Sequence, residues 1–464
     1  MSVGFAAMFA SATPSQGDET SEEIKTLKAQ IESLAQKVHA LERKRELDQA
    51  VVAEKAQLAE EKADAAPIVT AGPSGFSLQS ADGNFVIGFH GVLQLDSRTF
   101  IDENPKSVGK DTFLLRRARP ILSGTVFHDF EFMFVPDFGG STTQIFDAYM
   151  NYRNRPELQL QVGKFKSPVG LEHLQADVNT TFNERSMATD LVPNRDIGAE
   201  VHGDLYGAAF SYAVGIFIGA PDYSGTTTNA DYDNNKAFAG RVFLQPFRPT
   251  AIRALRGLGL GVGGSYENDQ ASSNTALNGL TPGLLTDGQQ IFFSYSSNVF
   301  ASGPHWRVAP QGYYYYGPLS LLAEYVVDDQ EVMKIANNPL IADLQNRAWE
   351  ITAGWVLTGE EASYNGVTPE YPFDLRTGHW GALQLVARVS ELRVDKDAFP
   401  VFASIATSAS AAHEWALGLN WYLNRNVRVN VSGSRTTFDG GNGAQAIVTR
   451  QSEEVIFTRV QLGF

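Results

Sequence analysis

From Asn84 onward, apolar and polar residues alternate with a period of two, in segments of about ten residues separated by Gly, Pro, Asn and Asp clusters. In the first segment Phe85, Ile87 and Phe89 fall on one face, while His90 and Gln94 fall on the other. A period of two is the side-chain repeat of a β-strand. The pattern predicts sixteen strands, at about 85–98, 113–127, 130–138, 145–152, 158–162, 197–206, 208–218, 237–247, 258–266, 306–315, 319–327, 349–357, 380–392, 415–422, 427–434 and 455–464. The apolar run 291–300 is assigned to a long loop or to an extension of the next strand.

This succession of strands over 84–464 is longer than a soluble sandwich domain. Long connections, such as 268–289 and 329–345, alternate with short ones, and Tyr or Trp residues stand near many strand ends. Both features are typical of barrels that cross the bacterial outer membrane. We therefore predict a sixteen-stranded antiparallel outer-membrane β-barrel for 84–464. The alternative is a tandem of soluble β-domains with aromatic cores.

The segment 21–63 has a different pattern and contains no Gly or Pro. β-Branched residues and leucines each recur every seven residues, which predicts an α-helical coiled coil. This seam consists of Ile24, Leu27, Ile31, Leu34, Val38 and Leu41. It indicates oligomerisation or a periplasmic spacer, and the alternative is a solvated amphipathic helix. The alternation of β-branched residues with Leu favours dimers in parallel coils, so it does not by itself indicate a trimer.

Three further segments complete the organisation of the chain. Residues 1–12 end in Ala10-Ser11-Ala12 and are predicted to be the remnant of an export signal. Residues 64–83 are rich in Pro, Gly and Ser and are predicted to be a linker. The last strand alternates through Val460 and Leu462 to an aromatic residue, Phe464, which resembles the C-terminal signature of outer-membrane barrels.

Composition excludes several classes of function. With no cysteine, the chain has no disulfide framework, Cys-ligated zinc site or thiol nucleophile. A net charge of -15 disfavours nucleic-acid binding, which needs dense Lys and Arg. The longest apolar run, 212–220, is too short for a transmembrane helix. No nucleophile elbow, His-Glu-x-x-His or P-loop motif is present, so we predict neither an enzyme nor a cofactor nor a metal.

The barrel segment resembles the phosphate- and polyphosphate-selective porin family. The resemblance rests on the order and spacing of five blocks: GNFVIGFHGVLQLDSRTF, TFLLRRARPILSGTVFHDFEFMFVPDF, IFDAYMNYRNRPELQLQVGKFKSPVGLEHL, VLTGE and ALGLNWYLNRNVRVNVSGS. It implies a sixteen-stranded barrel, a homotrimer and passive conduction of anions through each protomer. It also implies an inward-folded constriction loop after the fifth strand.

The chain departs from this family where phosphate selectivity is set. Family members carry lysines in the constriction, but here His173 follows Gly170-Leu171-Glu172, Glu131 stands early in the third strand, and Val178 takes a third position. Without those lysines a partly dehydrated phosphate loses its point-charge donors.

The remaining charges are candidates for the pore lining. The basic candidates are Arg98, Arg116, Arg117, Arg119, Arg153 and Arg185, and the acidic ones are Glu131, Asp137, Asp147 and Glu172, with His173 in the loop. Opposed clusters of this kind create a transverse field across a pore. Strand alternation allows only one of Arg116 and Arg117 to face the lumen, and Lys110, Lys164 and Lys166 are expected at the barrel rim. The alternative for each residue is a solvated charge that only keeps the channel wet.

These observations predict an outer-membrane porin that passes small hydrophilic solutes, including anions such as phosphate. Its expected partners are membrane lipid, two further copies of the chain, and peptidoglycan or another envelope component bound by the periplasmic helix. The alternative is a structural anchor that tethers the envelope through its coiled coil.

Overall fold

The computed structural model describes residues 19–64, 66–101, 109–140, 143–219, 233–270, 283–441 and 450–464. The chain divides into two compact units, 1–67 and 68–464. The predicted export-signal remnant, 1–12, lies outside the described residues.

The first unit contains one long helix, α1 (Glu19–Asp64), whose 46 residues extend over about 69 Å. The predicted seam lies on it, and the seam side chains are exposed in the single chain, for example Ile31 at 63% and Leu41 at 65%. Across the described residues, no helix combines the length and the apolar character that crossing a membrane requires.

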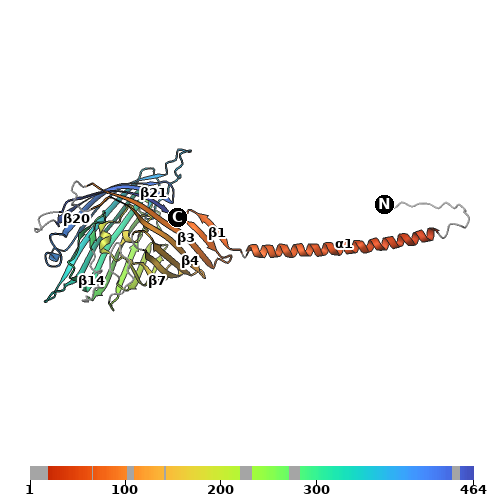
Figure 1. Ribbon diagram of the computed structural model, residues 1–464, viewed down its shortest axis with the longest axis horizontal. Helices are drawn as coiled ribbons and strands as arrows, with labels where there is room; N and C mark the ends of the chain where they lie inside the picture. Colours follow the sequence, from red (N-terminus) through yellow and green to blue (C-terminus); the bar gives the residue numbers. More distant parts are fainter. Residues whose placement is uncertain are drawn as a thin grey trace. The chain divides into compact units, whose positions relative to one another are not determined.

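The second unit is a closed antiparallel β-barrel of sixteen strands (Figure 1). Each strand pairs with its neighbour in the sequence, and the last pairs with the first: Leu462 lies opposite Leu93. The strands are β3 (Phe85–Phe100), β4 (Thr112–Val126), β5 (Phe130–Asp137), β6 (Gln144–Arg155), β7 (Leu158–Lys166), β8 (Arg195–Leu205), β9 (Phe210–Phe217), β10 (Ala237–Leu244), β11 (Leu258–Asp269), β14 (Val299–Tyr316), β15 (Leu319–Lys334), β16 (Leu340–Val356), β19 (Ala382–Arg393), β20 (Ala409–Tyr422), β21 (Val427–Gly440) and β22 (Glu453–Gly463).

The alternating apolar and polar residues of each strand lie on opposite faces of the barrel wall, with the apolar side chains outward and the polar ones toward the lumen. On β16, Ile351 and Trp355 point outward and are 42% and 52% exposed, whereas Glu350 is 1% exposed on the lumen side. Most connections at one end are short turns such as 127–129 and 317–318, with 357–381 as a long one, and connections such as 167–194 and 394–408 lie at the other end. We call these the short-turn end and the long-connection end.

All sixteen predicted strands are present. The run 291–300, predicted as either a long loop or an extension of the next strand, is divided between a loop, which holds the two-stranded pair β12 (Leu284–Leu285) and β13 (Ile291–Phe293), and the start of β14. The 357–381 connection holds another small pair, β17 (Ala362–Ser363) and β18 (Gly366–Val367).

Residues 64–83, predicted as a linker, contain a β-hairpin that the sequence did not lead us to expect. Strands β1 (Ile68–Gly72) and β2 (Gly75–Gln79) pair with each other, and β2 also pairs with the start of β3. The Asn426 side chain fixes the hairpin to the last strand, because its Nδ2 donates to the backbone oxygens of Pro73 and Gly463, each at 2.6 Å. These tertiary contacts stabilise strands of five residues that are too short to be read from periodicity alone.

Phe464 closes the seam between the first and last strands. Its backbone exchanges two hydrogen bonds with Gly91, at 3.0 and 3.1 Å. Its ring packs 6.1 Å from Phe76 on the hairpin and 6.2 Å from Phe89 on β3. A Cβ atom at position 91 would lie 2.8 Å from this ring, so any larger residue there would have to displace the Phe464 side chain.

We predict that Phe464→Ala destabilises the refolded barrel by roughly 1–3 kcal/mol, because a half-buried aromatic side chain is removed from the seam. Thermal unfolding in detergent measures this effect. The matched control is Phe113→Ala, since Phe113 is 88% exposed. An equal loss of stability in both variants would contradict the assigned packing of Phe464.

Candidate functional site

The connection 167–194, between β7 and β8, lies inside the barrel, and we call it the constriction loop. It contains the short helices α2 (Leu171–Leu174) and η1 (Met187–Leu191). Side chains from four strands of the barrel wall, β14, β19, β21 and β22, hold the backbone of this loop. They donate to its carbonyl groups as follows: Gln311 to Val169, Arg428 to Thr180, Arg459 to Asn183, Arg388 to Glu184 and Gln461 to Val178. The loop therefore spans the lumen from β14 to β22.

Glu184 of the constriction loop is held by three arginines of the wall. Arg116 donates from Nε and Nη2 at 2.7 and 2.9 Å, Arg98 donates at 3.0 Å, and Arg459 lies at 3.5 Å. Burial by itself would raise the pKa of Glu184, but the Arg116, Arg98 and Arg459 guanidiniums outweigh it and hold the pKa well below its usual range. The carboxylate therefore stays ionised at neutral and mildly acidic pH. The free energy of folding that the ionised Glu184 contributes is lost only as the pH falls below the usual glutamate range, where the carboxylate becomes protonated.

Asp177 forms the second anchor of the same loop. Arg119 hydrogen-bonds to it, Arg185 Nη2 lies 2.7 Å from Oδ1, and Arg117 Nε lies 3.4 Å from Oδ2. Burial opposes the charge of Asp177, but Arg117, Arg185 and Arg119 together keep its pKa well below the usual range. Arg119 also binds Asp137 on β5 at 2.6 Å. The loop is thus joined to β4 and, through Arg119, to β5.

Arg116 and Arg117 both face the lumen, which corrects the expectation that only one of them would. Gln94 lies opposite Arg117 and Leu95 lies opposite Leu115, so Arg116 is an extra residue in a β-bulge on β4. A bulge interrupts the alternation of side chains and can turn two consecutive residues to one face. Arg116 therefore reaches Glu184 while Arg117 donates to Gln94 at 2.6 Å.

Three other predicted residues lie in or beside this cluster. Glu172 accepts hydrogen bonds from the Ser186 backbone and hydroxyl at 2.8 and 2.7 Å, and so joins the two ends of the loop. His173 is buried, and burial, with the nearby Lys166 and Arg185 cations, keeps its pKa well below the usual histidine range. Asp147 lies 3.1 Å from Arg195 at the edge of the cluster.

Glu131, also predicted for the pore lining, does not lie in this cluster. It lies near the start of β5, at the short-turn end, and pairs with Arg153 at 2.8 Å, where both side chains are more exposed than the loop carboxylates. Lys164 and Lys166 are not at the rim as expected, because both are on β7 beside the loop. Lys164 is only 4% exposed, and Lys166 Nζ donates to the carbonyls of His173 and Gln175 at 2.7 and 2.9 Å.

Several important residues were missing from the predicted set, chiefly Asp177, Glu184, Arg388 and Arg459. Period-two alternation on the last strand does place Arg459 on the lumen face, opposite the face of Val460 and Leu462. Loop residues such as Asp177 and Glu184 follow no period, so their positions become visible only in the folded chain.

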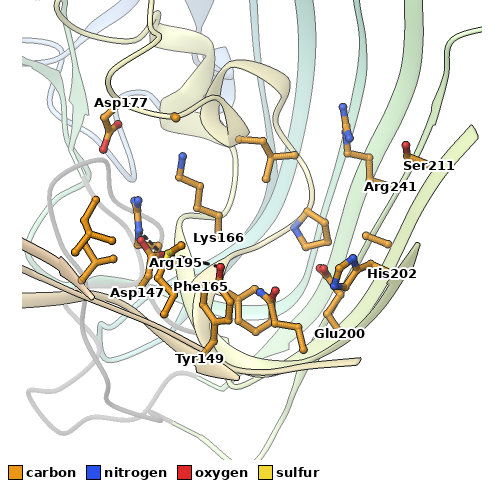
Figure 2. A pocket seen from close by; sticks show the side chains of 18 of the residues that line it. Asp147, Tyr149, Phe165, Lys166, Asp177, Arg195, Glu200, His202, Ser211 and Arg241 are labelled. Atoms are coloured by element: carbon orange, nitrogen blue, oxygen red, sulfur yellow. Dashed lines mark hydrogen bonds and ion pairs between the residues drawn. The ribbon is translucent and has the colours of Figure 1, made fainter. Parts of the chain in front are cut away.

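Two cavities border the constriction loop. The larger, of about 650 Å³, lies between the loop and the wall formed by β3 to β10, and Figure 2 shows Lys166, Arg195, His202 and Arg241 among its lining residues. Its charged lining residues are balanced in number: Arg119, Lys166, Arg195 and Arg241 against Asp147, Asp177, Glu200 and Asp204. The smaller cavity, of about 70 Å³, is lined by five arginines and three carboxylates: Arg116, Arg117, Arg119, Arg185 and Arg195 with Asp177, Glu184 and Asp190.

Comparison with known families decides the identity of the barrel. The family model of phosphate-selective porins O and P matches residues 88–464. The chain belongs to this porin family. The porin is therefore an outer-membrane channel, and the constriction loop lies within its lumen.

Solved structures agree with this fold. The outer membrane channel DcaP of Acinetobacter baumannii is 12% identical with a TM-score of 0.54, and the match covers 84% of this porin and 100% of DcaP. An anion-selective porin from Comamonas acidovorans is 10% identical with a TM-score of 0.51, and the match covers 82% and 100% of the two chains. No curated protein matches the sequence.

We predict that Glu184→Gln makes the porin more anion-selective, because it removes the carboxylate shared by three guanidiniums. A unit charge about 8 Å from a passing ion contributes roughly 0.5 kcal/mol in water, with opposite sign for an anion and a cation, so the anion-to-cation permeability ratio is expected to rise about five-fold. Reversal potentials in a KCl gradient measure the ratio. Glu157→Gln, in the exposed turn between β6 and β7, is the control and should leave it unchanged.

Proposed function

We propose that this porin passes small hydrophilic solutes down their gradients with a moderate preference for anions and without a tight phosphate site. The observation that carries the proposal is the excess of arginines over carboxylates in the small cavity beside the constriction loop. His173 stays neutral and adds no charge, while Asp137 and Asp147 pair with Arg119 and Arg195 from outside the cavity, so the positive charge is confined to the lining of the cavity itself. A fixed positive charge raises the local concentration of anions and lowers that of cations.

The pairing of the cations limits how strong this preference is. Glu184 and Asp177 of the loop are each shared by three guanidiniums, and Lys166 Nζ is directed at backbone carbonyls. A phosphate would have to compete with these partners for its hydrogen bonds. The three family lysine positions are occupied by Glu131, His173 and Val178, and none of these side chains supplies an ammonium donor.

A structural anchor was the alternative function. The large cavity in the lumen supports a channel over a plugged anchor. Anchoring by the helix is compatible with conduction, since the helix forms a compact unit of its own.

Planar-bilayer recording tests the proposed function. We expect discrete conductance steps and a reversal potential on the anion side in a KCl gradient, and millimolar phosphate should leave the chloride current unblocked. A strong block by phosphate would contradict the absence of a tight phosphate site. Cation selectivity would contradict the role assigned to the arginines.

We further propose that the porin is a homotrimer and that α1 lies in the periplasm, where its apolar seam packs against the helices of the other protomers. The exposure of this seam in the single chain supports the proposal, because a seam of this length is stabilised by burial against a partner. Peptidoglycan or another envelope component is the second partner proposed for the helix.

The absence of native cysteine makes the helix packing directly testable. We predict that Leu34→Cys in the assembled porin forms disulfides between protomers on mild oxidation, because seam positions face each other in a coiled coil. Gln36→Cys is the control, since position 36 lies away from the seam and should remain free. Electrophoresis without reductant separates the linked and unlinked forms, and equal crosslinking at both positions would contradict the seam.

A further inference from the structure

A second cluster of charged side chains lies on the lumen face at the long-connection end, on strands β11, β14 and β15. Glu267 and Asp269 are two residues apart on β11 and point to the same face, and His305 on β14 lies directly opposite Glu267. All three are buried, with exposed fractions of 9%, 7% and 4%. His305 Nδ1 lies 3.1 Å from Glu267 Oε1 and 3.5 Å from Asp269 Oδ2.

A hydrogen bond at the second ring nitrogen, Nε2, fixes the orientation of the His305 imidazole. His305 Nε2 lies 2.6 Å from Asp328 Oδ1 on β15, and the second oxygen of Asp328 accepts a hydrogen bond from Asn346 at 3.2 Å. In neutral histidine this arrangement places the proton on Nε2 and the lone pair on Nδ1. A carboxylate that orients a histidine in this way is the usual outer partner of a histidine metal ligand.

The Nδ1 lone pair of His305 therefore points at the carboxylate oxygens of Glu267 and Asp269. Because a lone pair and two anionic oxygens repel one another, a cation is needed between them. Arg307 supplies one positive charge: its Nη1 donates to Glu267 Oε1 at 3.0 Å and its Nη2 lies 3.2 Å from His305 Nδ1. Against this single charge stand three carboxylates, those of Glu267, Asp269 and Asp328. With histidine neutral the cluster keeps two negative charges, which a divalent cation would balance.

We propose that Glu267, Asp269 and His305 form a zinc site in the pore wall, with Asp328 as the residue that positions the histidine. Bonds of about 2.0–2.1 Å at tetrahedral angles place neighbouring ligand atoms about 3.3 Å apart, and the two measured distances from Nδ1 lie on either side of this value. The three candidate ligand atoms lie within 4.8 Å of one another. Three protein ligands leave one coordination position for water. The site is independent of the proposed anion preference, which depends on the constriction loop.

Zinc titration of the purified, detergent-solubilised porin tests the proposal. Isothermal titration calorimetry should show one zinc ion per chain in the wild type, and His305→Ala should abolish this binding. Asp328→Asn should keep the site but weaken it roughly 10- to 100-fold, as expected when an outer partner loses its charge. His413→Ala is the matched control and should leave zinc binding unchanged. His413 also lies between two carboxylates, at 2.9 Å from Glu391 and 3.4 Å from Asp439, but each of its ring nitrogens faces only one of them.

A second readout does not depend on comparing variants. Cobalt(II) in place of zinc should give the intense visible absorption of a four-coordinate ion in the wild type, and zinc should displace it. The absence of zinc binding and of this absorption would overturn the proposal, leaving a proton and Arg307 as the cations that hold the cluster. Zinc binding that persists in a folded His305→Ala porin would overturn it too, since the ion would then lie elsewhere.

Discussion

Two buried carboxylates of the constriction loop, Glu184 and Asp177, determine how this pore is built. Each is compensated by three arginines, most of them from the barrel wall, and burial makes these ion pairs mutually dependent. Removing one partner of a buried pair leaves an uncompensated charge, which typically costs about 3–5 kcal/mol. The loop therefore cannot leave the lumen without exposing unpaired charges on both sides. This requirement is what converts an open barrel into a channel with a defined narrow region.

The same pairing explains why selectivity is expected to be moderate. The arginines that pair with Glu184 and Asp177 are not free to attract anions at full strength, because they share these carboxylates. Carboxylates such as Asp177 provide rigidity, and they reduce the field that acts on a passing ion. The porin thus combines the arginine-rich lining of its small cavity with the balanced charge of its larger cavity.

Most of the barrel was predictable from the sequence. A strand whose two faces meet lipid and lumen must alternate apolar and polar side chains, and each of the sixteen alternating segments corresponds to one strand of the barrel. The constriction was predictable only in part. Arg98, Arg117 and Arg185 were found by residue type and position, but the bulge that turns Arg116 inward has no sequence signal of its own. The positions of Glu184 and Asp177 depend on how an aperiodic loop folds against distant strands. The hairpin β1–β2 escaped notice for a related reason, since its stability comes from β3 and Asn426.

The position of the constriction loop is the central claim, and a disulfide tests it most directly. A Cβ atom placed on Gly463 of β22 would lie 3.8 Å from Cβ of Val178 in the loop, the mean separation found in disulfides. The double variant Val178→Cys, Gly463→Cys, in a chain without other cysteines, should form this bond under oxidising conditions while its single-channel conductance stays close to that of the wild type. If both thiols of the folded porin instead remain free to react with a maleimide reagent, the loop does not lie against this wall.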